Sequence, residues 1–338
     1  MTDLVPLQPG ATPAAYDPAT LAVLAAMDQA AEEHLDAIRP HNTKRGYEND
    51  WNLWEEFQDW LGERTGHRVA STHVTKGMLV GFVVWLDTVK IAAPASIDRR
   101  ITGVTVTARS LGVEVSKEAT VAARKALKPL KLDPDRIARG RGKAPAATPA
   151  QLQQMYAAAP AGLAGLRDRA LWLMAFGMAG RSSEVAALRT DAIALVGKGL
   201  DVHVPSVKGL PARKVRVAYG KNPDTCPVRA WLVWKAAAGL TDGPAFRPIS
   251  VHGQLGTDGL TPSGCQEIIS RSAERAGLAV RLTGHSMRSG FITTARQAGK
   301  REEKIRAQSG HAANSPVFWG YIQEADAWTD AASEDIGL

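Results

Sequence analysis

A break near the middle of the chain constrains its fold more than any other feature. Residues 134–147, with the sequence PDRIARGRGKAPAA, are rich in Pro, Gly and Ala and carry no apolar periodicity. Such a composition is typical of a connection between domains. A chain of 338 residues also has room for two domains of roughly 100 to 200 residues each. We therefore predict a first domain at 17–133, a basic linker at 134–147 and a second domain at 148–338.

Helical periodicity dominates before the linker. Residues 1–16 are rich in Pro, Ala and Gly and are predicted to be a disordered tail. Asp17 followed by Pro18 indicates a helix start, and Asn42 is a candidate cap for a second helix. Large apolar side chains recur at helical spacing in that second helix, at Tyr47, Trp51, Trp54 and Leu61. We predict that this stripe is core rather than a base-stacking surface, in a domain of four or five helices.

The second domain combines helices with a short β-structure. Thr148, Pro149 and Gln151 form the pattern of a capping box with Pro at the first helical position. The runs DVHVPSV and RKVRVAY, which start at residues 201 and 213, alternate around a turn that contains Gly209 and Pro211. This alternation predicts a β-hairpin between residues 200 and 219. The expected fold class is mainly α with a small β-hairpin or sheet.

The charge balance favours a polyanionic partner. The net charge is +7 and the pI is about 9.5, as in many nucleic-acid-binding proteins, although proteins of the membrane surface share this balance. Basic side chains also fall on one face of a predicted helix and along the linker, at Lys117, Arg124, Lys128, Arg136, Arg139, Arg141 and Lys143. A charged face is often only solvated, but one of a single sign is also typical of phosphate contact. These residues are our candidate DNA contacts.

Nothing in the sequence predicts a membrane or secreted protein. The longest apolar run, Met78 to Leu86, is far shorter than the roughly 20 residues of a membrane span. The first residues lack the basic and apolar regions of a secretory signal. Cys226 and Cys265 have neither metal-ligand spacing nor the number expected of a disulfide framework, so we interpret both as reduced thiols. We expect a cytoplasmic, nucleoid-associated protein.

Polar residues of four short segments are candidates for chemistry. Arg181 is placed at a helix start with Glu184 one turn later, and the positive end of a helix favours an anionic ligand there. A plain surface ion pair is the alternative. Lys208 is placed at the hairpin tip, from which its side chain can reach a cleft or simply keep the edge soluble.

The last candidates lie toward the end of the chain. His285 and Arg288 are three residues apart and therefore share a helical face. His311 follows in SGHAANSPV, and Tyr321 in FWGYIQEADAW. Each of these residues alone is more often a packed or surface side chain than a catalytic one. Their order along the chain is the informative feature.

Arg, Lys, His-x-x-Arg, His and Tyr in this order resemble the tyrosine recombinases of the phage-integrase type. The matching segments are GRSSEVAAL at 180–188, VKG at 207–209, GHSMRSG at 284–290, SGH at 309–311 and GYI at 320–322, with NTKRGYENDW at 42–51 resembling the family's DNA-gripping domain. Gly320 stands where a basic residue often precedes the tyrosine, and the turn after Lys208 is longer than in Xer-type members. Lys214 on the same hairpin is an alternative to Lys208.

The resemblance implies a two-domain, C-shaped clamp and a reaction on DNA. Tyr321 would attack a backbone phosphate, giving a 3′-phosphotyrosyl intermediate and a free 5′-hydroxyl. Arg181 and Arg288 would bind the phosphate, because a guanidinium presents a planar fork to two oxygens. A phenol is only about one part in a thousand ionised at pH 7, so His285 is the candidate base. Lys208 is the candidate acid for the 5′ oxygen.

Further expectations follow from the same resemblance. His311 would orient the phosphate, and Glu184 would hold Arg181 or Lys208 in place. The covalent link conserves the bond energy, so no ATP, metal or other cofactor is expected. Implied partners are double-stranded DNA with inverted-repeat recombination sites and three further copies of the chain, joined on a Holliday junction, with possible accessory proteins.

The tail is the candidate assembly element. Apolar residues fall on one helical stripe at Ala325, Trp328, Ala332 and Ile336, with acidic residues away from it. The resemblance implies that this segment binds a neighbouring subunit, and packing against its own domain is the alternative.

Two other functions remain open at this point. One is a non-catalytic DNA-binding protein of integrase shape, although phosphate contact alone requires no Tyr321. The other is an enzyme like the type IB topoisomerases, which relaxes supercoils by similar chemistry. The gripping domain and the tail after Tyr321 favour recombination for integration, excision or resolution.

Overall fold

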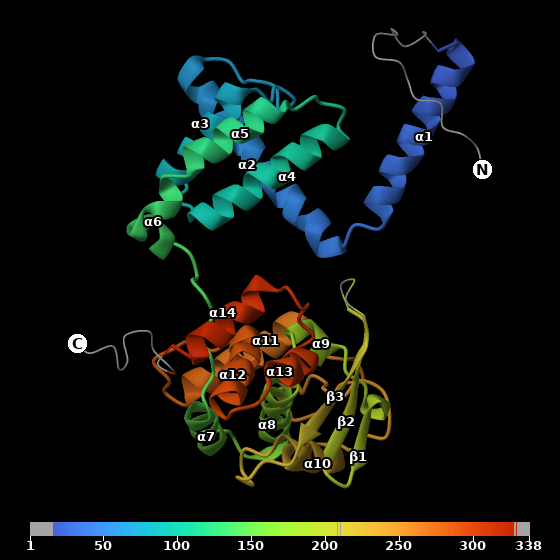
Figure 1. The fold of residues 1–338 in the computed structure, drawn as a ribbon, viewed down its shortest axis with the longest axis vertical. Helices are drawn as coiled ribbons and strands as arrows, with labels where there is room; N and C mark the ends of the chain where they lie inside the picture. The colour runs from blue at the N-terminus through green and yellow to red at the C-terminus, as the bar shows by residue number, and fades with distance from the viewer. Residues whose placement is uncertain (1–15, 208, 210, 328, 330–338) are drawn as a thin grey trace. The chain divides into compact units, whose positions relative to one another are not determined.

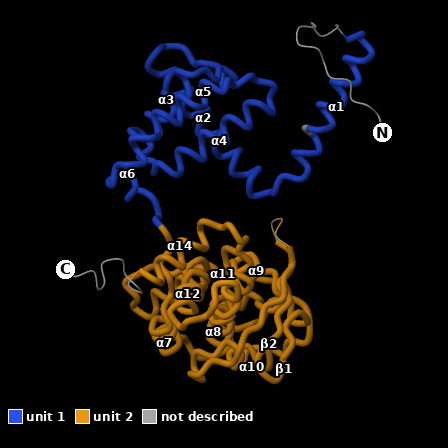
Figure 2. The backbone as a smooth tube through the Cα atoms, in the orientation of Figure 1, with its two compact units in different colours: residues 1–142 blue, residues 143–338 orange. Residues whose placement is uncertain are grey.

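The computed structural model describes residues 16–207, 209, 211–327 and 329. The chain forms two compact units, residues 1–142 and 143–338 (Figures 1 and 2). The boundary between them falls inside the segment predicted as a linker, 134–147. Residues 1–15, nearly all of the predicted tail, lie outside the described residues.

The first unit is helical. Its helices are α1 (Pro18–Ala37), α2 (His41–Thr65), α3 (Lys76–Thr88), α4 (Pro94–Ser110), α5 (Lys117–Leu127), η1 (Leu130–Leu132) and α6 (Pro134–Ala138). Asp17 caps α1 as the sequence predicted, and its carboxylate accepts the backbone N–H groups of Ala19 and Thr20. The cap predicted for α2 was wrong: this helix begins at His41, because the Pro40 carbonyl already accepts the backbone N–H of Thr43 at 2.8 Å.

Aromatic rings of α2 and α3 form the centre of the first unit's core. Trp54 is fully buried, and its ring lies edge-on to that of Phe82 with 5.2 Å between centroids. The core therefore includes the stripe predicted on α2, although Tyr47, Trp51 and Leu61 are only partly buried. Aromatic packing of this kind contributes beyond the area that it buries.

The short helix α6 is tied to α3 by a buried carboxylate. Asp87, 6% exposed, accepts hydrogen bonds from Arg136 Nε at 2.9 Å and Arg139 Nη1 at 2.7 Å. Arg136 also pairs with Asp133. Helical structure thus extends to residue 138, inside the predicted linker. The composition of the linker did not indicate this helix, because Asp87, the partner of Arg136 and Arg139, lies on another helix.

The second unit surrounds the buried helix α8. Its elements are α7 (Pro149–Ala157), α8 (Gly162–Gly177), α9 (Ser182–Ala186), η2 (Thr190–Ala192), β1 (Ile193–Val196), β2 (Gly199–Val204), β3 (Arg213–Ala218), α10 (Pro227–Ala237), α11 (Pro262–Arg275), α12 (Gly284–Gln297), α13 (Glu302–Ser309) and α14 (Pro316–Ala325). Thr148 and Gln151 form the predicted capping box. Residues 170–175 of α8 are all buried, and α10, α11 and α12 pack against this helix.

The sheet has three antiparallel strands in the order β1-β2-β3 (Figure 1). The predicted hairpin is confirmed as β2 and β3, with Val202 opposite Val215 and His203 opposite Lys214. Strand β1, which the sequence did not predict, is exposed along most of its length. In β3, Val215 and Val217 face the core while Lys214 and Arg216 are exposed. The fold is therefore mainly helical with a small antiparallel sheet, as predicted.

Within the residues that the structure describes, no helix is both long enough and apolar enough to cross a membrane.

Candidate active site

Arg181 stands at the N-terminus of α9, directly after the turn that follows α8. The Glu184 carboxylate, 1% exposed, accepts the backbone N–H of Arg181 and its side-chain Nη1, each at 2.8 Å. Of the two partners that the sequence allowed for Glu184, the structure places Arg181 in contact. Lys208, the other, lies outside the described residues.

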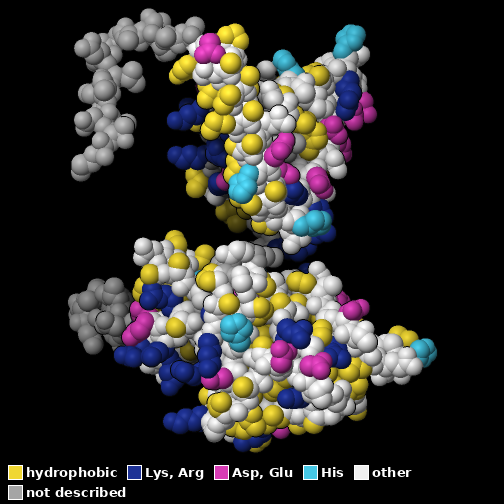
Figure 3. All heavy atoms as spheres, turned by 90° about the vertical axis from the view of Figure 1, so that its right-hand side faces the viewer, with side chains coloured by type: hydrophobic (Ala, Val, Ile, Leu, Met, Phe, Trp, Pro, Cys, Tyr) yellow, Lys and Arg dark blue, Asp and Glu magenta, His cyan; other side chains and the backbone are white. Residues whose placement is uncertain are grey.

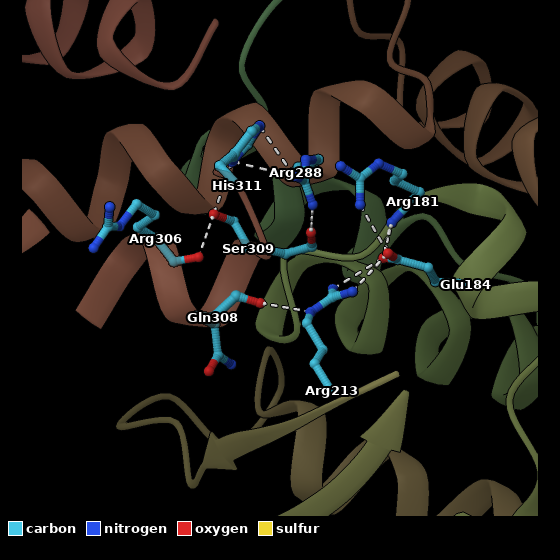
Figure 4. Close-up of polar contacts among 9 residues, drawn as sticks. Arg181, Glu184, Arg213, Arg288, Arg306, Gln308, Ser309 and His311 are labelled. Carbon is cyan, nitrogen blue, oxygen red and sulfur yellow. Dashed lines mark hydrogen bonds and ion pairs between the residues drawn. The ribbon is translucent and has the colours of Figure 1, made fainter. Parts of the chain in front are cut away.

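Arg213 is a residue of this cluster that the sequence analysis missed. It is the first residue of β3, and it donates to both oxygens of Glu184, at 2.6 and 3.0 Å (Figure 4). Its Nε also donates to the Gln308 carbonyl at 3.3 Å. The alternation in β3 was the signal available, because it places Arg213 on the same face as Val215 and Val217, and an inward-facing cation needs a buried partner.

Two guanidiniums set the charge state of Glu184. Burial raises the pKa of this carboxyl, but the hydrogen bonds from Arg213 and from the Arg181 backbone, together with both positive charges, outweigh burial. The pKa therefore lies below its usual value. Glu184 is an anion at neutral pH and holds the two arginines in place.

Arg288 lies on α12 and is 4% exposed. Its Nη1 donates to the Ala179 carbonyl at 2.7 Å, and its Nη2 lies 3.0 and 3.1 Å from the two ring nitrogens of His311 (Figure 4). Burial, followed by the charge of Arg181, lowers the pKa of Arg288 to about 9. The guanidinium nevertheless stays charged at neutral pH.

Two close approaches allow these elements to meet. A β-carbon on Gly284, at the start of α12, would lie 2.0 Å from Ser182 Oγ. Gly310 has φ +66°, and a β-carbon there would lie 3.0 Å from Arg213 Cδ. Glycine therefore suits both positions, and at 310 the left-handed conformation favours it as well.

His311 follows Gly310 and is uncharged. Burial, followed by the charge of Arg288, lowers its pKa to about 3. Ser309 Oγ lies 3.2 Å from the Arg306 carbonyl and 2.9 Å from His311 Nδ1. Since a carbonyl can only accept, Ser309 donates to it and accepts from Nδ1–H. This tautomer leaves Nε2 as the acceptor for Arg288.

Tyr321 lies on α14, which packs against α12, and is 8% exposed. The centroid of its ring is 6.4 Å from that of His311. Lys143 Nζ lies 4.8 Å from the centroid of the Tyr321 ring, and Lys143 also pairs with Glu324 one turn further along α14. The structure thus brings Tyr321 together with His311, and through His311 with Arg288.

The remaining catalytic candidates are placed as follows. His285 is exposed in the first turn of α12, three residues before Arg288. Lys214 lies on the face of β3 opposite to Arg213, where its Nζ pairs with Asp201 at 2.7 Å. This pairing directs Lys214 away from Glu184, which weakens it as the alternative to Lys208.

The predicted DNA contacts differ in whether their side chains form ion pairs within the protein. Lys117, Lys128 and Arg141 are exposed. Arg124 pairs with Asp98 at 3.4 Å. The other three, Arg136, Arg139 and Lys143, are bound by Asp87, Asp133 and Glu324.

The cluster around Glu184 is suited to an anion. Two guanidiniums, those of Arg181 and Arg213, pair with one carboxylate, and Arg288 adds a third positive charge that interacts electrostatically with Arg181 and Glu184. A cavity of about 490 Å³ opens beside Arg181, Arg213 and His311. Figure 3 shows Lys and Arg side chains gathered along one side of the second unit. Among the described residues, no group of three or more His, Cys, Asp or Glu side chains is placed to hold a metal ion.

Comparison with known proteins identifies a relative with a described function. No protein-family model matches the chain. The chain is 26% identical to the integrase/recombinase xerD homolog of Selenomonas ruminantium over 314 residues, which cover 89% of this chain and 87% of the relative. Because the match covers 89% of this chain, it includes residues of both units. The chain is therefore similar to a recombinase over most of its length.

Solved structures of tyrosine recombinases share the fold. The Tn1549 transposon integrase, in complex with a circular intermediate DNA, has a TM-score of 0.58 at 16% identity and covers 84% of this chain and 90% of its own. Lambda integrase (residues 75–356) bound to DNA has a TM-score of 0.58 at 13% identity and covers 89% of this chain and 96% of its own. The helical scaffold with its small antiparallel sheet is therefore a tyrosine recombinase fold.

Proposed function

We propose that the protein is a site-specific DNA recombinase that cuts and rejoins strands through Tyr321. The observation that carries this proposal is the convergence of Arg181, Arg288 and a neutral His311 beside Tyr321, with more positive charge than Glu184 compensates. A phosphodiester is anionic, and negative charge builds on its non-bridging oxygens in the transition state. Fixed, partly buried cations stabilise such charge more than solvated ones do.

The first step balances as a phosphoryl transfer. The Tyr321 hydroxyl oxygen attacks phosphorus, the bond from phosphorus to the 5′ oxygen breaks, and a 3′-phosphotyrosyl link remains. His285 accepts the phenol proton, and Lys208 gives a proton to the departing 5′ oxygen. Because the link conserves the bond energy, a 5′-hydroxyl can rejoin the strand without ATP or metal.

Arg288 and His311 act together in this proposal. His311 Nε2 accepts from Arg288 Nη2 at 3.0 Å. A bound phosphate oxygen would compete for the same guanidinium nitrogen, because anionic acceptors make the stronger hydrogen bonds. His311 would then orient the phosphate beside Arg288.

Two rounds of exchange, through a Holliday junction, would recombine two DNA duplexes. The partners would be DNA with inverted-repeat sites and three further copies of this chain, which predicts a homotetramer, with accessory proteins at some sites. The two units would grip the duplex, with Lys117, Lys128 and Arg141 as the contacts least engaged elsewhere. Such a protein would act in the cytoplasm, on the nucleoid.

Trapping on a suicide substrate tests the proposed function. We expect the wild-type protein to form a covalent complex with a nicked site that loses its 5′-hydroxyl fragment, and Tyr321→Phe to bind the same DNA without forming it. A denaturing gel resolves the two outcomes. A covalent band with Tyr321→Phe would show that another residue is the nucleophile. Efficient relaxation of supercoiled DNA without a site would instead favour a topoisomerase.

A sulfur-substituted substrate tests the role of Lys208. Replacing the 5′ bridging oxygen by sulfur gives a leaving group that needs no proton, because a thiol is far more acidic than an alcohol. Lys208→Met should slow cleavage of ordinary DNA by roughly 10²- to 10⁴-fold. With the sulfur substrate, its cleavage rate should return close to that of the wild type. Lys214→Met is the matched control. A slow, sulfur-rescued Lys214→Met would transfer the role to Lys214.

Truncation tests the tail as the assembly element. Of its predicted stripe, Trp328, Ala332 and Ile336 lie outside the described residues, whereas Ala325 is the last residue of α14. Asp326 pairs with Arg296 at 2.8 Å, so the truncation should begin at Ala327. We expect single-site binding to persist and synapsis to be lost. Synaptic complexes of unchanged yield on a native gel would contradict the assembly role.

A further inference from the structure

We propose that Arg213 is a positioning residue for cleavage. It neutralises Glu184, so that the Arg181 guanidinium stays available to bind the scissile phosphate. It also supports the loop that carries His311. The proposal rests on the proposed function of this site. Arg213 lies between two catalytic candidates on different elements: Arg181 at the start of α9 and His311 in the segment after α13.

The Glu184 carboxylate is fully engaged. Its Oε1 accepts from Arg181 Nη1 at 2.8 Å and from Arg213 Nη1 at 2.6 Å. Its Oε2 accepts from the Arg181 backbone N–H at 2.8 Å and from Arg213 Nη2 at 3.0 Å. Arg213 thus forms the two-pronged contact, whereas the Arg181 side chain gives Glu184 only one nitrogen. This division leaves the rest of the Arg181 fork for another anion.

The removal of Arg213 would change the balance of charge around Glu184. Glu184 is 1% exposed, and a buried carboxylate without sufficient counter-charge is costly. If Arg213 were removed, Arg181 would be the one arginine among the described residues still paired with Glu184. The carboxylate would then draw the Arg181 guanidinium into a two-pronged pair. Arg181 would remain folded in place but would be a poorer ligand for phosphate.

Arg213 also supports the segment before His311. Its Nε donates to the Gln308 carbonyl, at 3.3 Å. The backbone of Gly310 lies against the Arg213 side chain so closely that a β-carbon would be 3.0 Å from Cδ. The Gln308 side chain in turn donates to the carbonyls of Gly177 and Arg216 (Figure 4 shows Gln308 beside Arg213). The Arg213 side chain therefore contacts both Glu184 and the segment before His311.

A double-mutant cycle tests the proposal. The single variants are Arg213→Met and Glu184→Gln, and the double variant combines them. Arg216→Met is the matched control, because Arg216 lies on the same strand with its side chain 83% exposed. Single-turnover cleavage of a suicide substrate at saturating DNA is the measurement, with DNA affinity and thermal unfolding recorded for each variant.

We expect Arg213→Met to cleave about 10- to 100-fold more slowly, the effect of losing charge-assisted hydrogen bonds, while its affinity for DNA changes little. Adding Glu184→Gln should restore part of the rate, because a neutral amide no longer competes for Arg181 yet still accepts its backbone N–H. Arg216→Met should cleave like wild type. A residue that served only the fold would show no such rescue, since the second substitution removes a further contact.

Two results would overturn the proposal: wild-type cleavage by Arg213→Met, or a double variant slower than Arg213→Met alone. Should Arg213→Met fail to fold, Arg213→Lys decides, because it keeps the charge and gives up the fork. We expect an intermediate rate for it, and a wild-type rate would contradict the positioning role. Absence of any covalent complex with the wild-type protein would count against the proposed function itself, before the variants are compared.

Discussion

Each unit contains a buried carboxylate that holds two arginines, but the two clusters are completed differently. In the first unit, Asp87 pairs with Arg136 and Arg139, and Asp133 adds a second negative charge to Arg136. Two guanidiniums meet two carboxylates, so this cluster is neutral. It joins α6 to α3.

In the second unit the same motif carries excess charge. Glu184 pairs with Arg181 and Arg213, and Arg288 adds a third guanidinium whose described contacts are a carbonyl and an imidazole. Buried positive charge without a matching anion destabilises the fold unless a ligand supplies the anion. A carboxylate with two arginines is therefore not in itself a sign of function, whereas among the described residues the cations beside Tyr321 exceed what Glu184 compensates and favour an anionic ligand.

Removing the excess charge should separate activity from stability most clearly. Arg288→Met keeps much of the side-chain volume, and we expect cleavage to slow by about 10²- to 10³-fold because one transition-state donor is lost. The free energy of unfolding should stay the same or rise, because a desolvated cation is removed from a positive cluster. Urea unfolding and single-turnover cleavage are the measurements. A large loss of stability would mean that Arg288 serves mainly the fold.

The neutral cluster should show the opposite pattern. We expect Asp87→Asn to lower the free energy of unfolding of the first unit by about 1–3 kcal/mol, the range for charged hydrogen bonds, and to leave cleavage at saturating DNA unchanged. Asp98→Asn is the control, since Asp98 pairs with Arg124 and Lys131 at the surface and such pairs contribute little. Equal stability of the Asp87 and Asp98 variants would remove the contrast between the two clusters.

The smallest effect concerns pH. The pKa of His311 is lowered to about 3 in the folded protein, whereas an unfolded histidine titrates near 6.5. The unfolded chain therefore takes up a proton that the folded protein refuses, and wild-type stability falls as pH decreases from 6.5 toward 3. The slope from this group is at most about 1.4 kcal/mol per pH unit, and partial exposure reduces it.

The measurement is urea unfolding of wild type and His311→Asn between pH 7.5 and 5. As pH falls from 7.5 to 5, the free energy of unfolding of the wild type should decrease more than that of His311→Asn. Parallel curves would mean that the folded protein protonates His311 over the same pH range as the unfolded chain does, which would contradict its proposed role as a neutral partner of Arg288.

Local patterns predicted those parts of the molecule that local physics determines. The cap at Asp17, the capping box at Thr148 and the β2–β3 hairpin follow from residues close together in sequence, and all three are confirmed. The predicted start of α2 at Asn42 was wrong because the Pro40 carbonyl already accepts the backbone N–H of Thr43. The edge strand β1 was missed because it is exposed along most of its length and has no alternating pattern.

The candidate site could be predicted from the sequence as a set of motifs but not as a network of contacts. Arg181, Arg288, His311 and Tyr321 could be named because their order resembles a family. Arg213 was missed: the alternation of β3 indicated that its side chain faces inward, but its partner Glu184 is 29 positions away and no motif joins them. The same holds for Asp87 and Arg139, 52 positions apart. Ion pairs between distant segments depend on tertiary packing, which a periodic pattern does not specify.

The chemical identity of the DNA linkage tests the central claim most directly. The covalent complex would be trapped on a suicide substrate, digested with protease and nuclease, and analysed by mass spectrometry for the peptide that retains a nucleotide. We predict a single modified peptide that contains Tyr321, joined to the 3′ phosphate of the cut strand. A nucleotide on any other residue, or a link to the 5′ end, would contradict the account.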